Sequence, residues 1–202
     1  MNKTIMLLIS LHVIFELQAQ TSEEAFISLP ESMAIELNVD ARRDLVDLYQ
    51  AGRKAIVENL LEDSVSIENM TPDYLLLKTG NDNMQIIILQ MINESKLYCL
   101  IQTVCAPACD SRIEFYSVSW KQLDTNTFIT PFPQSDFINA NENSSLPDMV
   151  FMQYIYSPET SSLQQIDNTF QNLSIEDQKA IQALIKKKVK EYKWNGFRFI
   201  GD

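Results

Sequence analysis

The chain has 202 residues, of which 46% are hydrophobic and 21% are charged, and its formal net charge at pH 7 is -11. This composition is typical of a folded globular protein and excludes a disordered chain. The negative charge repels phosphate backbones and anionic lipid surfaces, so we expect no nucleic-acid binding.

The first 20 residues predict a cleaved export signal. Lys3 precedes an apolar run, Ile5 to Phe15, that is short for a bilayer span, and small and polar residues follow it. We expect cleavage near Ala19 and a periplasmic or secreted protein without a membrane span. The remainder, 21–202, is predicted to be a single α+β domain, with a subdomain break near 125–146 as the alternative.

The sole histidine, His12, lies inside the predicted signal. Its removal excludes Ser-His-Asp and Cys-His catalysis and histidine metal sites in the mature protein. An enzyme built from this chain would depend on carboxylates, thiols, lysine, tyrosine or an oxygen-bound metal.

The amino-terminal part of the mature chain predicts helices. After a polar leader, residues 26–38 predict an extended arm with a turn. Asp40 suits an N-cap, and the apolar residues that follow it have helical spacing, with Arg42 on the face turned to water. Gly52 suits the end of this helix, and residues 56–61 continue it after a kink or begin a second short element.

From Val65 onward the apolar period becomes that of strands. Short turns separate the predicted strands and therefore indicate an antiparallel meander: 65–69, 74–78, 84–92, 97–104 and 112–118. Residues 84–92 are apolar on both faces, so we expect a central strand covered on both sides.

The remaining third predicts a long loop over 123–146 and a strand pair over 149–157 and 163–167. Ser174 begins a predicted helix whose buried stripe includes Ile185 and Val189, and whose late lysines compensate the helix dipole. Asn195-Gly196 then predicts a hairpin in which Trp194 and Phe197 pair across the turn.

The cysteines predict a disulfide. Cys105 and Cys109 flank a three-residue turn, and their pairing is the leading hypothesis in an exported protein. A Cys99–Cys105 bond is the competing one, and otherwise Cys99 is a small buried residue. Thiol-redox activity is a weaker hypothesis, because the spacing is not C-x-x-C and no histidine activates a thiolate. We expect no metal site.

A second constellation gives the candidate binding surface, composed of Asp110, Arg112, Glu114, Tyr116 and Trp120. Strand alternation puts Arg112, Glu114 and Tyr116 on one face. The structural alternative is a cross-strand ion pair with Asp110 capping a turn. A glycosidase needs two carboxylates at a defined separation, and the sequence offers Asp110, Glu114 and Asp124 without pairing them. Glycine is scarce, and no phosphate-binding loop is present, so no cofactor is expected.

These motifs are similar to an uncharacterised family of exported Bacteroidales proteins of the DUF3256 type. The resemblance lies in Arg43 to Asp47 with Ala51-Gly52, in Thr103 to Ser111, and in Phe115-Tyr116 through Trp120. It implies a Gram-negative envelope location and supplies no catalytic residues. We therefore expect a non-catalytic envelope protein of binding or structural type, its partner an unknown envelope protein or glycan. The alternative is a carboxylate-dependent periplasmic hydrolase of glycans or peptides.

Overall fold

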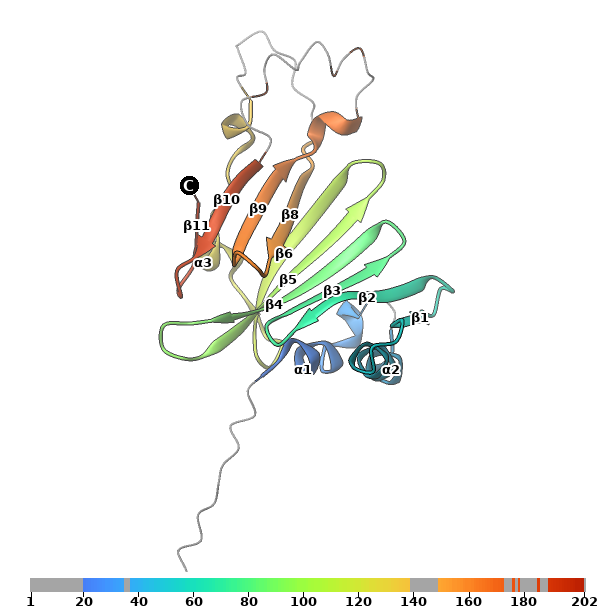
Figure 1. Ribbon diagram of the computed structural model, residues 1–202. Coiled ribbons are helices and arrows are strands. Elements are labelled where there is room, and N and C mark those ends of the chain that lie inside the picture. Colours follow the sequence, from blue (N-terminus) through green and yellow to red (C-terminus); the bar gives the residue numbers. More distant parts are fainter. Residues whose placement is uncertain are drawn as a thin grey trace, which may run out of the picture.

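Two antiparallel sheets build the protein, which is analysed as a computed structural model (Figure 1). The structure describes residues 20–34, 37–138, 149–172, 176, 178, 185 and 189–201. The first sheet has seven strands that neighbour one another in chain order: β1 Ile56–Glu58, β2 Ser64–Thr71, β3 Tyr74–Thr79, β4 Asp82–Gln90, β5 Lys96–Cys105, β6 Cys109–Ser117 and β7 Gln122–Leu123. The predicted meander is confirmed.

The second sheet has four strands in the order β11-β10-β9-β8: β8 Met152–Ser157, β9 Ser162–Asp167, β10 Val189–Trp194 and β11 Phe199–Gly201. The helical elements are short by comparison: α1 Ser22–Ile27, η1 Glu31–Met33, α2 Val39–Gln50, α3 Thr125–Phe128, η2 Gln134–Asp136 and η3 Thr169–Asn172. The described chain is therefore dominated by strands, with helices added to them. Among its helices, none has the length and apolar character that crossing a membrane requires.

Strand β4 separates two hydrophobic cores. Met84, Ile86 and Ile88 point into the core that α1 and α2 cover. Ile87 and Leu89 point into the core beneath the second sheet. Alternation along a strand sends successive side chains to opposite faces, so an all-apolar strand requires cover on both sides. The prediction of a doubly covered central strand is confirmed for residues 84–90, with helices on one face and a sheet on the other, whereas Met91 and Ile92 lie beyond the end of β4 and Ile92 is exposed.

The amino-terminal arm is helical where the sequence predicted a polar leader and an extended arm. Thr21 and Glu24 form a capping box: the Thr21 hydroxyl accepts from the Glu24 amide at 3.2 Å, and the Glu24 carboxylate accepts from the Thr21 amide at 3.4 Å. These reciprocal bonds satisfy donors at the start of α1. The prediction missed this helix of six residues because so short an element has little apolar periodicity.

Arg42 is buried rather than turned to water, with 3% of its surface exposed. Its guanidinium donates to the carbonyl of Phe26 at 3.1 Å and to that of Leu29. Carbonyls in and just after the last turn of a helix need donors, and Arg42 supplies donors to these two from the next helix. Helix α2 itself is capped by Asn38, whose side chain accepts from the Ala41 amide at 2.9 Å, instead of by Asp40.

The prediction that Gly52 ends helix α2 is confirmed, whereas the prediction for the residues that follow is wrong. Gly52 has a φ of 66°, and the Arg53 amide donates to the Leu48 carbonyl at 2.9 Å, as in a Schellman ending. Residues 56–58 then form strand β1 instead of helix. The next two leucines lie at an exposed turn, 74% and 64% exposed at positions 60 and 61, and so pack no helix face.

The carboxyl-terminal elements differ from prediction in two ways. Val189 begins β10, and Ile185 forms an isolated bridge with Ile138, so neither belongs to the predicted helix; most of 174–188 lies outside the described residues. In the hairpin, Trp194 pairs with Phe199 instead of Phe197. The Asn195 side chain accepts from two loop amides, which favours a four-residue loop over the two-residue turn.

Candidate functional site: a cleft between the two sheets

The predicted surface on β6 is a closed hydrogen-bond network centred on Glu114. This carboxylate accepts from Arg112 at 2.6 Å, from the Gln122 amide at 2.7 Å and from the Tyr116 hydroxyl at 3.1 Å. The side chain of Glu114 is 9% exposed, whereas that of Arg112 is 71% exposed. The structure thus brings Arg112, Glu114 and Tyr116 together on one face, and the ion pair runs along one strand instead of across two.

Trp120 joins this cluster through its ring and Asp110 does not join it. The Trp120 ring centre lies 4.8 Å from that of Tyr98 and 5.5 Å from that of Tyr116, and its indole nitrogen donates to Ser28 at 3.2 Å. These contacts connect the β6–β7 turn to α1. Asp110 instead accepts from the Met152 amide at 2.8 Å, so it holds the second sheet and does not cap a turn.

The cysteine predictions are confirmed. Cys105 and Cys109 form a disulfide at the end of the β5–β6 hairpin, where their residues pair directly. Cys99 is fully buried, and this burial raises the pKa of its thiol. A raised pKa keeps the thiol protonated at neutral pH, which makes Cys99 a packing residue without nucleophilic character.

The edge of the second sheet is held against the face of the first by side chains. The buried amide of Gln85 accepts from the Tyr156 backbone at 3.0 Å and donates to the Tyr154 carbonyl at 3.2 Å. Ser111 accepts from the Tyr154 amide at 3.0 Å. Side chains of the first sheet therefore take the place of a further strand for these outward backbone groups of β8, and the bonds of Gln85 connect β8 to β4.

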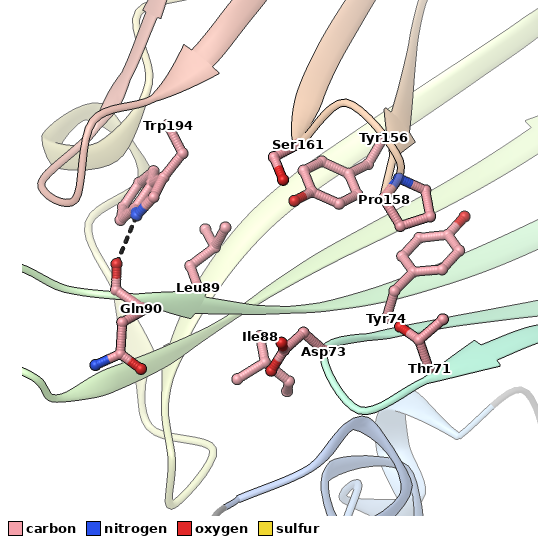
Figure 2. A pocket seen from close by; sticks show the side chains of 10 residues that line it. All are labelled: Thr71, Asp73, Tyr74, Ile88, Leu89, Gln90, Tyr156, Pro158, Ser161 and Trp194. Atoms are coloured by element: carbon pink, nitrogen blue, oxygen red, sulfur yellow. Dashed lines mark hydrogen bonds between the residues drawn. The ribbon is translucent and has the colours of Figure 1, made fainter.

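Where the two sheets diverge beyond this contact, an open cleft of about 300 Å³ lies between them (Figure 2). The first sheet contributes one side of the cleft from the β2–β3 turn and the end of β4, and the second sheet contributes the other from the β8–β9 turn and β10. The lining combines apolar, aromatic and polar side chains: Thr71, Asp73, Tyr74, Ile88, Leu89, Gln90, Tyr156, Pro158, Ser161 and Trp194. Concave sites with this mixture are typical of small-ligand binding.

Two tyrosines meet at the inner end of the cleft. The ring centres of Tyr74 and Tyr156 lie 5.9 Å apart, and the Tyr74 hydroxyl donates to Gln85 at 3.3 Å. Burial, helped by the charge of Glu159, raises the pKa of Tyr74 to about 12. Burial also raises the pKa of Tyr156, against a hydrogen bond from Ser161 that lowers it. Both hydroxyls therefore remain neutral at physiological pH and act as hydrogen-bonding groups instead of bases.

Trp194 forms the opposite end of the cleft. Its indole nitrogen donates to the Gln90 carbonyl at 2.7 Å, which ties β10 to the end of β4 (Figure 2). Phe199 packs edge-on against it at 5.1 Å between ring centres. The indole is thus fixed in orientation while it stays partly exposed.

The charged residue that lines the cleft is Asp73, which forms an ion pair with Lys96. Their nearest atoms lie 3.9 Å apart, and the Asp73 side chain is 68% exposed. Lys96 also donates to the Gln20 carbonyl at 3.0 Å. Asp73 is the single carboxylate among the described residues that line the cleft. Across the described chain, no three acidic, cysteine or histidine side chains gather in a way that would hold a metal ion.

Sequence reasoning missed this cleft because its residues come from four separate segments of the chain. Tyr74 and Tyr156 are 82 positions apart (156 − 74) and carry no local motif. The available indication was Trp194 beside Asn195-Gly196, which the sequence assigned to packing. The packing role is confirmed by the Phe199 contact, and the position at the cleft depends on how the two sheets meet.

Comparison with known proteins supplies the family. A family model described as "Protein of unknown function (DUF3256)" matches residues 14–199. The chain belongs to this family. The resemblance stated from its motifs is thereby confirmed.

A solved structure is similar to this DUF3256 member over most of its length. It is described as a domain of an uncharacterized protein from Porphyromonas gingivalis W83, and it matches with a TM-score of 0.77 and 24% sequence identity. The match covers 89% of this chain and 98% of that chain. At this identity the likeness shows the fold alone. No curated protein matches this chain.

Proposed function

We propose that this DUF3256 member is exported to the cell envelope and acts there as a non-catalytic binding protein, with the cleft between the sheets as its ligand site. The observation that supports this most is the cleft itself, in which fixed aromatic rings alternate with a few polar groups. The amino-terminal pattern of Lys3 and the apolar run to Phe15 supports export.

The contacts of the acidic residues favour binding over carboxylate-dependent hydrolysis. Hydrolysis of a glycosidic bond needs an acid and a second carboxylate on either side of that bond. Of the sequence candidates, Glu114 is saturated by three donors, Asp110 is bound to β8, and Asp124 caps α3. Asp73 is alone among the described lining residues of the cleft.

The two tryptophans of the chain offer a direct test, because Trp194 lines the cleft and Trp120 packs against α1. In the Trp120→Phe variant, all tryptophan fluorescence comes from the cleft. We expect size-fractionated envelope extracts to change this emission in a saturable manner. The matched Trp194→Phe variant, which reports from Trp120, is expected not to respond.

Repeating this titration with the Asp73→Asn variant tests whether the emission change comes from a ligand bound in the cleft. The control is Asp44→Asn, on the exposed surface of α2. The proposal predicts weakened binding for Asp73→Asn alone. It is overturned if no fraction changes the Trp194 emission, or if the protein converts the bound material into products.

A further inference from the structure

The chemistry of the cleft also points to a class of ligand, an inference that rests on the proposed function. The first observation concerns Trp194. Its one hydrogen-bond donor is already used on the Gln90 carbonyl at 2.7 Å, and its edge-on contact with Phe199 holds the ring still. What the indole offers a ligand is therefore its π face. Such a face attracts the weakly positive C–H groups of a flat ring or the charge of a cation.

The second observation concerns the polar groups at the rim. Asp73 supplies a carboxylate that only accepts, and Tyr156 and Ser161 supply hydroxyls that both donate and accept. Figure 2 shows these two hydroxyls on the side of β4 that faces Trp194, whereas the side chain of Gln90 points to the other side. A sugar hydroxyl is also at once a donor and an acceptor, so neighbouring hydroxyls of a sugar match this set of groups.

The third observation concerns charge. The carboxylate of Asp73 helps to raise the pKa of Tyr156, and that of Glu159 helps to raise the pKa of Tyr74, so both fields reach the interior of the cleft. An anionic ligand such as a uronate or a phosphate is repelled there. A cation gains less than the acidic rim suggests, because Asp73 already lies beside Lys96 and the two tyrosine rings pack on each other instead of forming a cage.

The size of the cleft limits the ligand further. About 300 Å³ is at the lower end of the range for ligand sites, which suits one or two rings of a short oligosaccharide whose remaining ring extends out of the open cleft, and not a folded partner. We infer that the cleft binds a neutral saccharide, stacked on Trp194 and hydrogen-bonded by Asp73, Tyr156 and Ser161.

The test uses the mature Trp120→Phe protein and three soluble probes: a neutral trisaccharide of N-acetylglucosamine, the acidic trisaccharide of galacturonic acid, and trilysine. We expect the neutral saccharide to change the Trp194 emission in a saturable manner and to bind at least roughly tenfold more tightly than either charged probe. Asp73→Asn and Ser161→Ala are expected to weaken it severalfold, and Asp44→Asn is expected to leave it unchanged.

Cellotriose serves as a second neutral probe that lacks the acetamido group, so comparing the two shows whether that group is required. Binding of either neutral probe supports the inference. The inference is overturned if trilysine or the acidic saccharide binds more tightly than both neutral probes, or if neither neutral probe binds. When an envelope fraction still changes the Trp194 emission in that case, the ligand class is wrong and the proposed binding function stands. When no fraction does, both fail.

Discussion

Replacing Gln85 with alanine tests how the second sheet is held on the first. This side chain is 2% exposed and bonds both the Tyr156 amide and the Tyr154 carbonyl of β8. The change leaves the buried carbonyl of Tyr154 and the partly buried amide of Tyr156 without partners, and each such group costs about 1–3 kcal/mol. We therefore expect a loss of about 2–6 kcal/mol in the free energy of unfolding. For a chain of this size that is a fall in Tm of roughly 5–20 °C.

The assay is urea unfolding followed by circular dichroism, with the slope m compared between variants. Gln102→Ala is the matched control, because Gln102 is half-buried on the opposite face of the neighbouring strand β5. It is expected to cost less than about 0.5 kcal/mol, as surface changes usually do. If Gln85→Ala is as stable as Gln102→Ala at the same m, the bonds of Gln85 do not hold the edge of β8, and the explanation given for the position of the cleft is wrong.

Three further outcomes follow from the core and the cysteines. Burial raises the pKa of Tyr74 and Tyr192 to about 12, against about 10 in an unfolded chain. Because folding favours their neutral form, the contribution of these tyrosines to the free energy of unfolding is complete below about pH 10 and is lost as the pH rises toward 12. Unfolding free energies that stay constant between about pH 10 and 12 would contradict this. Replacing both Cys105 and Cys109 with serine should lower the free energy of unfolding by about 2 kcal/mol or less, because the loop that the disulfide closes is short. The circular dichroism spectrum of the folded protein should be preserved, and its loss would refute this expectation. In the oxidised native protein, Cys99 should resist a thiol reagent and react once urea unfolds the chain, so rapid labelling without denaturant would show that it is not buried.

The sheet order could be predicted because local information determined it. Each pair of neighbouring strands in the meander is joined by a short connection, and the apolar run 84–92 required cover on both faces. The Cys105–Cys109 bond was predictable for the same reason, since a tight turn brings its ends together. In each case the deciding contacts lie close together in the chain.

Errors arose where long-range contacts override local preference. Arg42 lies in a helix whose exposed neighbours are charged, yet it is buried because the carbonyls of Phe26 and Leu29 need a donor. Asp110 resembled a turn cap, but its partner is the Met152 amide of the second sheet. No pattern near either residue encodes these partners.

The candidate surface on β6 and the cleft illustrate the same limit. Alternation correctly placed Arg112, Glu114 and Tyr116 on one face, and the hydrogen bonds then showed that they bind one another. The cleft exists only because β8 and β10 stand over the end of β4. That arrangement is a property of the folded chain as a whole.

The most direct test of the binding site compares the two indole N–H signals in an ¹H–¹⁵N spectrum of the mature protein titrated with the neutral trisaccharide of N-acetylglucosamine. One signal belongs to Trp194 in the cleft and the other to Trp120, which packs against Tyr98 and Tyr116 on the far side of the first sheet. We expect the Trp194 signal to shift together with the backbone amides of 73–74, 88–90, 156–157 and 159–161, while the Trp120 signal stays in place. Shifts confined to Trp120 and the β6 surface would place the ligand there and contradict the cleft as the binding site.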